Sequence, residues 1–456
     1  MAGFTRRRMI QGGGALATTM AAAMAASQEA MAAPAKRKPN VIIVLADDLG
    51  YGDVGAFGAK LIKTPSLDRM AKEGVMLKTF FASANICTPS RAGLLTGRYP
   101  IRTGLAYEVI QATDTNGLPL SEVTIAEALK PDYATALIGK WHLGHVTPFW
   151  PPTVQGFDLF FGLPYSHDMK PLNLYTAEPG VELTKEDVDF PQLTARFFNR
   201  GFKFIEDNKA NPFFLVLALT APHVPLNPHP DHMGKSQAAA YGDVVEEVDE
   251  NVGKLLKKLK ALDLERDTLV IVTSDNGPWY QGSTGGLRDR KGGAGWEGGY
   301  RVPFIARQPG VIPAGLVSDQ IAMNIDFMPT IMAWTGKPLP QGVEIDGRDM
   351  TGLLTKKGAA TPHDQLLFFN NEKIAAIRNQ RWKYIVRSYY RSYEFPLDTY
   401  KWDVLIDLKT DQAEAYDVSS LHPDVRQDMQ ARLDAARKIF DPMAVHQPPD
   451  RLPGQK

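Results

Sequence analysis

Two pairs of oxygen-bearing side chains each follow an apolar run of the sequence. Asp47 and Asp48 come directly after one such run, and Asp275 and Asn276 come two residues after another. The carboxyl ends of neighbouring parallel strands meet at the same edge of a sheet, so we expect the four side chains to lie together there. Because crowded carboxylates repel one another without a cation between them, this all-oxygen set suits calcium or magnesium rather than zinc. Either pair taken alone would be typical of a turn at a strand end.

The single cysteine of the chain is a second candidate for chemistry. Cys87 is followed by Thr-Pro-Ser-Arg, and Pro89 suits the first turn of a helix. Cys87 is therefore expected at a helix N-terminus, where backbone N–H groups and the helix dipole favour an anion. Only three residues separate Cys87 from Arg91, whereas a thiolate phosphatase needs a longer loop, so that mechanism fits poorly. The segment alone would be equally compatible with a buried free cysteine.

Four continuous apolar runs predict the strands that position these residues. Continuous runs, rather than alternating ones, are typical of strands buried on both faces of a parallel sheet. Between the last two runs, apolar residues recur at helical spacing from Val244 to Leu259, which predicts a helix. Strand, helix and strand in that order indicate a right-handed crossover unit of an α/β fold. The runs are Val41–Ala46, Ala134–Ile138, Phe213–Leu219 and Leu269–Val272.

The rest of the chain predicts a long loop and a smaller second layer. Residues 281–299 contain eight glycines in nineteen positions, and structureless segments of this length are usually functional loops. Past Gly336 the composition changes, and short strands of an antiparallel sheet are expected before a closing helix from Pro423 to Phe440. The expected strands cover residues 375–378, 382–386 and 402–407.

The segment from Cys87 to Arg98, Cys-Thr-Pro-Ser-Arg-Ala-Gly-Leu-Leu-Thr-Gly-Arg, resembles the signature of the type I sulfatases. In that family the cysteine of the Cys-x-Pro-x-Arg motif is oxidised after translation to formylglycine. The segment from Gly162 to Asp168 resembles the arylsulfatase A-like branch in particular. Other segments similar to the family are Pro39–Gly55, Ile138–Gly144, Ala221–His223, Asp275–Gly277 and Leu405–Asp411.

The resemblance implies a fold of the alkaline phosphatase superfamily. This is an α/β fold with a large mixed, mostly parallel sheet flanked by helices, followed by a smaller C-terminal antiparallel sheet plus helix. We expect the catalytic α/β domain over residues 40–340 and the smaller α+β subdomain over residues 341–456.

The resemblance also implies the cation and the nucleophile. Calcium, rather than magnesium, is expected, and Cys87, as formylglycine, would contact it. One hydroxyl of the formylglycine hydrate would attack sulfur and displace the alcohol, which leaves a covalent sulfate ester. The second hydroxyl would then allow sulfate to be expelled. The implied metal ligands are Asp47, Asp48, Asp275, Asn276 and Cys87.

Positive charge for the sulfate and the hydrate is implied at three positions. Arg91 and Lys140 lie within segments that match the family, and Lys291 would bind the substrate together with Lys140. The segment after Lys291 is one residue longer than the common pattern, which leaves Arg288 and Arg290 as alternatives.

Proton transfer and sulfate binding are implied for three further side chains. His142 would take a proton from the remaining hydroxyl while sulfate is released. His223, with Lys291, would protonate the leaving oxygen, since imidazole suits general acid chemistry near neutral pH. Ser166 would hydrogen-bond the sulfate. The implied catalytic set is Cys87, Arg91, Lys140, His142, His223 and Lys291.

The N-terminal segment resembles a twin-arginine export signal. Arg6, Arg7 and Arg8 precede an Ala- and Gly-rich run, and small residues at 30–32 offer a cleavage site. The run is too weakly apolar for a stable membrane anchor, which needs about 20 strongly apolar residues. We expect an export signal over residues 1–33, a linker over 34–39 and a periplasmic or secreted protein. A basic tail or an amphipathic helix is the alternative interpretation.

The composition and the motifs together define the predicted function. The chain of 456 residues has 51 Lys and Arg and 51 Asp and Glu, which argues against nucleic-acid or membrane-surface binding as its main role. The predicted function is hydrolysis of an aryl or carbohydrate sulfate ester, after maturation by a formylglycine-generating enzyme. Two alternatives stay open: a promiscuous phosphoesterase or phosphonate hydrolase on the same fold, and a non-catalytic protein that captures sulfated glycans.

Overall fold

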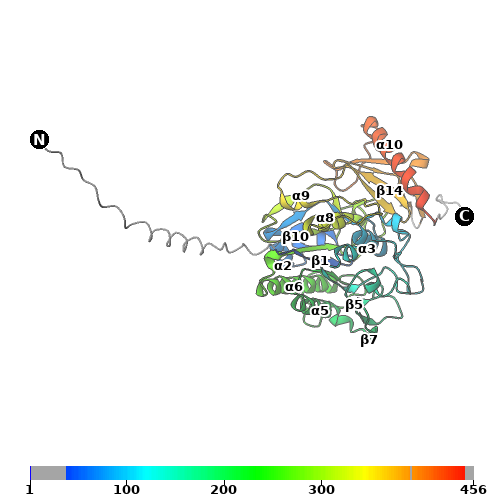
Figure 1. Cartoon of the computed structure of the whole chain (residues 1–456). Coiled ribbons are helices and arrows are strands. Elements are labelled where there is room, and N and C mark those ends of the chain that lie inside the picture. Colours follow the sequence, from blue (N-terminus) through cyan, green and yellow to red (C-terminus); the bar gives the residue numbers. More distant parts are fainter. Residues whose placement is uncertain (2–36, 391–392, 447–456) are drawn as a thin grey trace. The chain divides into compact units, whose positions relative to one another are not determined.

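The computed structural model describes residues 1, 37–390 and 393–446 (Figure 1). The chain divides into two compact units, residues 1–38 and 39–456, and all described helices and strands belong to the second. Apart from Met1, the expected export signal lies outside the described residues, as does half of the expected linker, residues 34–36. Among the described residues, no helix combines the length and the apolar character that crossing a membrane requires.

The apolar runs form the centre of a ten-stranded mixed sheet, as their continuous hydrophobicity predicts. β1 (Asn40–Ala46) lies between β8 (Phe213–Ala218) and β9 (Thr268–Ser274) and is parallel to both. β4 (Ala134–Lys140) pairs in parallel with the other side of β8. The strand order is β11-β2-β10-β9-β1-β8-β4-β5-β6-β7. The outer strands are β2 (Val75–Leu77), β5 (Leu159–Leu163), β6 (Leu174–Ala177), β7 (Thr184–Glu186), β10 (Phe304–Arg307) and β11 (Leu316–Ser318).

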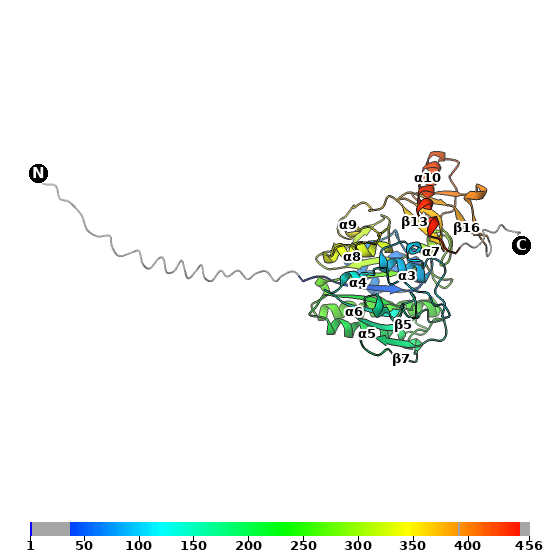
Figure 2. The ribbon, with the colours of Figure 1, turned by 45° about the vertical axis from the view of Figure 1, so that its right-hand side comes forward.

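Helices cover both faces of this sheet, which gives three layers (Figures 1 and 2). Along β1, Val41 and Ile43 belong to one buried apolar cluster, whereas Ile42 and Val44 belong to the other. The helix expected over residues 244–259 lies within α6. The helices of the first cluster are α3 (Cys87–Thr96), α4 (Ile125–Leu129), α8 (Phe327–Thr335) and α9 (Thr351–Thr355). Those of the second are α2 (Pro65–Glu73), α5 (Leu193–Asp207) and α6 (Ala239–Ala261).

An antiparallel sheet and a helix form the C-terminal part, as the resemblance implies. The sheet order is β13-β14-β15-β18, and each neighbouring pair is antiparallel. α10 (Pro423–Phe440) has the predicted bounds and places Met429 and Leu433 in an apolar cluster with these strands. The strands are β13 (Leu366–Asn370), β14 (Lys373–Arg378), β15 (Trp382–Ile385) and β18 (Val404–Asp407). Two small sheets were not expected, and their strands are β3 (Phe80–Phe81), β12 (Ala322–Met323), β16 (Arg387–Tyr390) and β17 (Tyr393–Pro396).

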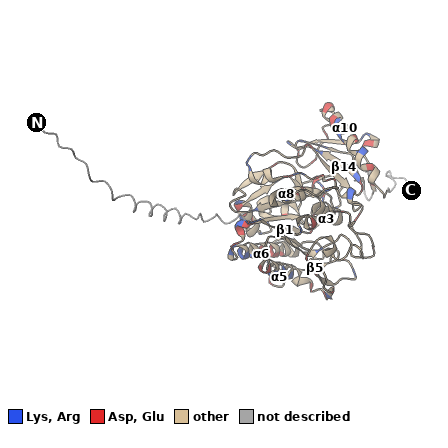
Figure 3. Ribbon diagram, viewed as in Figure 1, with Lys and Arg blue, Asp and Glu red and all other residues tan. Residues whose placement is uncertain are grey.

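Buried charges join the end of the glycine-rich loop to the C-terminal sheet. The loop expected over residues 281–299 ends earlier, because the short helix α7 (Glu297–Tyr300) begins within it. The fully buried Glu297 carboxylate contacts Arg378 of β14 and lies 3.1 Å from Arg301. Charged residues of both signs occur in this region, around β14 and α10 (Figure 3). Burial alone would raise the pKa of Glu297, but Arg378, Lys383 and Arg301 bring it down to about 2.

We expect Glu297→Gln to lower the free energy of unfolding by about 3–5 kcal/mol, because it leaves the two arginines buried beside a neutral amide. The folded-state pKa of about 2 is below the unfolded value of about 4.3. The stabilisation from Glu297 is therefore present above about pH 4.3 and is lost as the pH falls towards 2. Urea unfolding of the wild type and the variant, at pH 7 and at pH 3, measures both effects.

The control for this prediction is Glu265→Gln. The Glu265 side chain is 26% exposed and lies 3.2 Å from Arg307, so its loss should change the free energy of unfolding by less than about 1 kcal/mol. Equal destabilisation by the two variants would contradict the role assigned to the buried cluster.

Candidate active site

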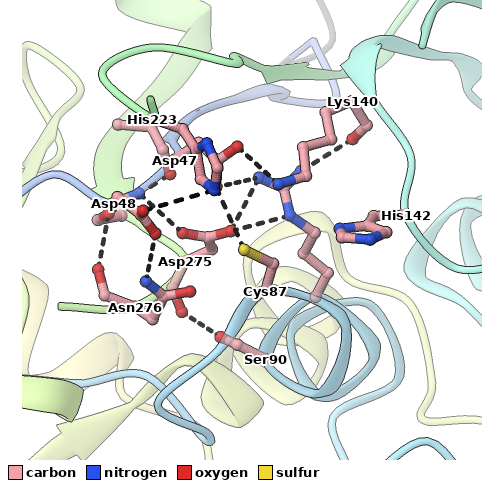
Figure 4. A network of polar contacts seen from close by, with 12 residues as sticks. Asp47, Asp48, Cys87, Ser90, Lys140, His142, His223, Asp275 and Asn276 are labelled. Atoms are coloured by element: carbon pink, nitrogen blue, oxygen red, sulfur yellow. Dashed lines mark hydrogen bonds and ion pairs between the residues drawn. The ribbon is translucent and has the colours of Figure 1, made fainter. Parts of the chain in front are cut away.

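The two oxygen-bearing pairs meet at the carboxyl edge of the sheet, because β1 and β9 are parallel neighbours in register. Ala46 pairs with Ser274, so Asp47 and Asp275 leave the sheet side by side, and the Asp275 N–H donates to the carbonyl of Ala46 at 3.1 Å. The N–H of Asp48 donates to Asp275 Oδ1 at 3.2 Å, and Asn276 Nδ2 donates to Asp48 Oδ1 at 2.7 Å. The three carboxylates are buried together with the amide of Asn276 (Figure 4).

Helix α3 places Cys87 against this group. Cys87 is the first residue of the helix and Pro89 lies in its first turn, as the sequence predicts. Cys87 Sγ lies 3.4 Å from Asp47 Oδ1. The hydroxyl of Ser90, one turn from the N-terminus, donates to the carbonyl of Asp275 and ties the helix to the end of β9.

Arg91 connects three parts of the site. Its Nε donates to Asp275 Oδ2 at 2.9 Å, and its Nη1 donates to the carbonyl of Lys140 at 2.8 Å. Its Nη2 lies 3.5 Å from Asp47 Oδ1. Since Arg91 is itself buried, its charge acts on these carboxylates with little screening by solvent.

Lys140 ends β4 and pairs with one of these carboxylates. Its Nζ lies 2.7 Å from Asp47 Oδ2, and both side chains are completely buried. The preceding Gly139 has a φ of 121°, and a Cβ there would lie 1.8 Å from the carbonyl oxygen of Ala218. Glycine at 139 therefore permits the close approach of β4 and β8 that brings Lys140 to Asp47.

The glycine-rich loop brings Lys291, and neither nearby arginine, to the site. Lys291 Nζ lies 2.8 Å from Asp48, and its backbone N–H donates to the carbonyl of Pro278 at 3.1 Å. Arg288 lies over the Trp296 ring, and Arg290 lies over the Tyr280 ring. Arg288 and Arg290, the alternatives to Lys291, therefore lie against aromatic rings rather than at the carboxylates of the site.

The donor set fits a hard cation. Asn276 Oδ1 is buried and has no hydrogen-bond partner within the described part of the chain. Potential ligand atoms of Asp47, Asp48, Cys87 and His223 lie within 4.8 Å of one another. Burial, reinforced by the negative charge of Asp47, raises the pKa of Asp275 to about 6. A divalent cation bound among these oxygens would relieve that repulsion and use the orphaned amide oxygen.

The buried surroundings shift the pKa values of Asp47 and Cys87 in opposite directions. Burial by itself would raise the pKa of Asp47, but Lys140, His223 and Arg91 outweigh it and hold that pKa well below its usual value. Burial raises the pKa of the Cys87 thiol, despite the opposing charges of Lys140 and Lys291. The unmodified cysteine is therefore a protonated thiol at neutral pH and a weak nucleophile.

His142 is held as a neutral imidazole. Burial, followed by the charges of Lys140 and Arg91, lowers its pKa well below the usual histidine value. Its Nε2 lies 3.0 Å from the carbonyl of Ile110, which requires the proton on Nε2 and leaves Nδ1 as an acceptor. Within the described residues Nδ1 has no hydrogen-bond partner. The backbone of His142 has a φ of 61°, a conformation that is uncommon outside glycine and is concentrated at functional sites.

His223 approaches the cluster from the loop after β8. Its Nε2 lies 3.7 Å from Asp48 Oδ2, and its Nδ1 contacts the carbonyl of Val224. The ring packs edge-on against His167, with 5.6 Å between centroids. His223 is 9% exposed, so it lies at the boundary between the buried cluster and solvent.

A cavity of about 680 Å³ opens onto these groups. The structure places every site residue predicted from the sequence in the buried cluster or on this cavity. Sequence reasoning missed Thr88, whose hydroxyl donates to the carbonyl of His142 at 2.9 Å. Thr88 lies inside the segment from Cys87 to Arg98, and this position is the feature of the sequence that could have identified it. The predicted side chains that line the cavity are Asp48, Cys87, His142, Ser166, His223 and Lys291.

The chain is similar to sulfatases in sequence and in structure. A family model described as Sulfatase matches residues 39–337, and one described as N-sulphoglucosamine sulphohydrolase, C-terminal, matches residues 294–448. Steryl-sulfatase of Homo sapiens is 34% identical over 433 residues, which cover 75% of this chain and 74% of that protein. Arylsulfatase A of Homo sapiens is 38% identical over 363 residues, which cover 73% of this chain and 71% of that protein. The solved PsFucS1 sulfatase from Pseudoalteromonas sp. aligns with a TM-score of 0.82 at 28% identity, over 93% of this chain and 94% of that one.

These similarities cover the parts of the chain that build the site. The sulfatase match extends from the start of β1 to the end of α8 and includes the Cys87 segment and the glycine-rich loop. The large mixed sheet and the small C-terminal sheet match the fold of the solved sulfatase, so the predicted fold class is confirmed. The chain therefore belongs to the sulfatase family and is a hydrolase of sulfuric esters.

Proposed function

We propose that this enzyme hydrolyses aryl or carbohydrate sulfate esters with a formylglycine, formed from Cys87, as its nucleophile beside a calcium ion. The position of Cys87 carries the proposal. The residue lies at the first turn of α3, contacts Asp47 and lines the cavity. As a buried thiol, the unmodified Cys87 is a weak nucleophile. The charged side chains around residue 87 are therefore better explained if the thiol is replaced by formylglycine.

The buried charges suit an anionic ester. Calcium held by Asp47, Asp48, Asp275 and Asn276 would draw charge from the sulfate oxygens and lower the pKa of the attacking hydroxyl. Arg91 and Lys140 keep Asp47 and Asp275 oriented through the ion pairs described above. The Lys291 ammonium lines the cavity and can bind a sulfate oxygen there, and Ser166 offers a hydroxyl on the same wall.

Covalent catalysis divides hydrolysis into two steps. If Cys87 is converted to formylglycine, one hydroxyl of its hydrate would bond to sulfur as the alcohol leaves, and loss of a proton from the other hydroxyl would expel sulfate and restore the aldehyde. His142 can accept that proton at Nδ1, because Nε2–H is already engaged by Ile110. His223 lies where it can protonate the departing oxygen, with Lys291 beside it on the cavity wall.

Peptide mass spectrometry tests the nucleophile. The segment that contains Cys87 is isolated from protein made in the native host, with and without a carbonyl-trapping reagent. We expect an aldehyde at residue 87. An unmodified thiol in an active preparation would contradict the proposal. If the preparation is inactive and the thiol is unmodified, the protein is co-expressed with a formylglycine-generating enzyme. Turnover of a sulfate ester by co-expressed protein that still carries the thiol would again contradict the proposal.

The same preparation separates the two alternative functions. A promiscuous phosphoesterase or phosphonate hydrolase would show comparable kcat/KM for matched sulfate and phosphate esters, whereas we expect the sulfate ester to be preferred. A protein that only captures sulfated glycans would bind them without turnover. The presence of all the predicted catalytic side chains in one cluster supports an enzyme.

Three further proposals concern the context of the enzyme. We propose that residues 1–33 direct export, which the arginines at positions 6–8 support, and that the enzyme acts in the periplasm or outside the cell. A formylglycine-generating enzyme is the proposed maturation partner, and the Cys-Thr-Pro-Ser-Arg segment supports this. The proposed division into a catalytic domain over 40–340 and a subdomain over 341–456 is supported by the four-stranded antiparallel sheet of the C-terminal part, whose strands pair only with one another in that sheet.

A further inference from the structure

The wall of the cavity away from the buried cluster has charged side chains of its own. Beyond the metal cluster, three charged side chains line the cavity: Glu108, Asp168 and Lys170. Glu108 and Asp168 are exposed, and neither forms an ion pair with another described residue. The Lys170 ammonium lies over the ring of Phe190, 4.8 Å from its centroid. Against this one ammonium, the two carboxylates leave the wall with a net negative charge.

Both carboxylates are exposed and line the same cavity as the buried Cys87, so they lie towards its opening. Burial alone would raise the pKa of Asp168, but the Ser166 side chain and then the charge of His223, the proposed acid for the leaving oxygen, lower it. Glu108 belongs to the segment that also contributes Val109, Gln111 and Thr113 to the wall. An ester whose sulfate occupies the cluster would extend its leaving group into the part of the cavity that these two segments line.

An apolar ring completes the outer wall. Trp279 is 40% exposed and lines the cavity. Its ring packs edge-on against Tyr280, with 4.8 Å between centroids, which fixes its orientation. A flat ring on the leaving group can stack on Trp279. Substituents of that ring would then lie in the field of Glu108 and Asp168.

We propose that Glu108 and Asp168 select substrates by the charge of the alcohol part, favouring uncharged or cationic ring alcohols with a single sulfate over polyanionic ones. This inference rests on the proposed function, because it takes the cluster at Cys87 as the sulfate position. A second sulfate or a carboxylate on the leaving group meets two unpaired carboxylates, and such like-charge contact acts against a wrong substrate. A cationic substituent meets an attractive field at the same place.

Two matched substrates test the charge selection. These are 3-carboxyphenyl sulfate and 3-(trimethylammonio)phenyl sulfate, and the measured quantity is the ratio of their kcat/KM values. In the double variant Glu108→Gln, Asp168→Asn, we expect this ratio to shift by about tenfold towards the carboxylate substrate, which corresponds to about 1.4 kcal/mol. The intrinsic reactivity of each ester is the same with both enzymes, so it cancels in this comparison.

A matched control removes two carboxylates that do not line the cavity. Glu178 and Glu186 pair with Arg200 and Arg196 on the surface, and the variant Glu178→Gln, Glu186→Gln should leave the ratio unchanged. The same ratio in the Glu108, Asp168 variant as in the wild type would overturn the inference, whether or not both rates fall. If the mature wild type hydrolyses neither ester nor 4-nitrophenyl sulfate, the proposed function itself fails and the inference falls with it.

Discussion

Replacing Cys87 with serine should lower the steady-state turnover of a sulfate ester by about 10⁴-fold or more, while one sulfate becomes covalently bound per chain. A serine hydroxyl in the same place can still attack sulfur. Its sulfate ester has no second hydroxyl on the same carbon, so it cannot expel sulfate internally and must wait for water. Turnover assays combined with intact-protein mass spectrometry, after incubation with 4-nitrophenyl sulfate, measure both effects.

Cys87→Ala is the matched control for this result. Alanine removes the nucleophile altogether, so it should show the same loss of turnover with no bound sulfate. Because Cys87 is buried, thermal unfolding of both variants is compared with that of the wild type. Steady turnover by the serine variant, or an equal mass in the two variants, would contradict covalent catalysis at residue 87.

Weaker calcium binding is expected to cause the second largest loss of activity. Asn276→Ala deletes the buried amide oxygen that has no other partner among the described residues, and it leaves Asp48 without its 2.7 Å hydrogen bond. We expect calcium affinity to fall by about 100-fold or more and kcat/KM to fall by about 10³-fold, since the charge that acts on the sulfate is lost. Isothermal titration of chelator-treated protein with calcium gives the affinity independently of turnover.

The control for metal binding is a buried carboxylate outside the site. Asp249 of α6 accepts hydrogen bonds from the N–H groups of Ser66 and Leu67, at 3.0 and 2.8 Å. Asp249→Asn should destabilise the fold but leave the calcium affinity of the folded protein unchanged. Calcium binding by the Asn276 variant at wild-type affinity would contradict the ligand assignment, and restoration of the chelated wild type by magnesium alone would contradict the choice of ion.

The sequence predicts those parts of the site that regular elements position. The apolar runs before Asp47 and Asp275 are long enough to specify buried parallel strands, and parallel strands in register bring the residues after them together. Pro89 marks the start of a helix, so the place of Cys87 at its N-terminus followed from residue type alone. In α10 the predicted bounds agree with the structure, because His422-Pro423 begins the helix clearly.

Contacts between distant segments could not be predicted in the same way. Glu297 is fully buried against Arg378, 81 residues away, and no local pattern announces that pairing. The walls of the cavity come from irregular segments without periodicity, and Glu108 has a φ of 54° that its residue type does not suggest. The short strands β2 and β10 pair with each other beside β9 and depend on their neighbours for burial.

Because Cys87 is the only cysteine among 456 residues, the maturation state of a sample can be counted. Each chain that has been converted to formylglycine loses its one thiol, and each unconverted chain keeps it. The thiol is buried, so the count requires unfolded protein. If formylglycine is the nucleophile, as proposed, the number of thiols per unfolded chain equals the inactive fraction of the preparation, and a measured rate constant can be corrected to the active molecules.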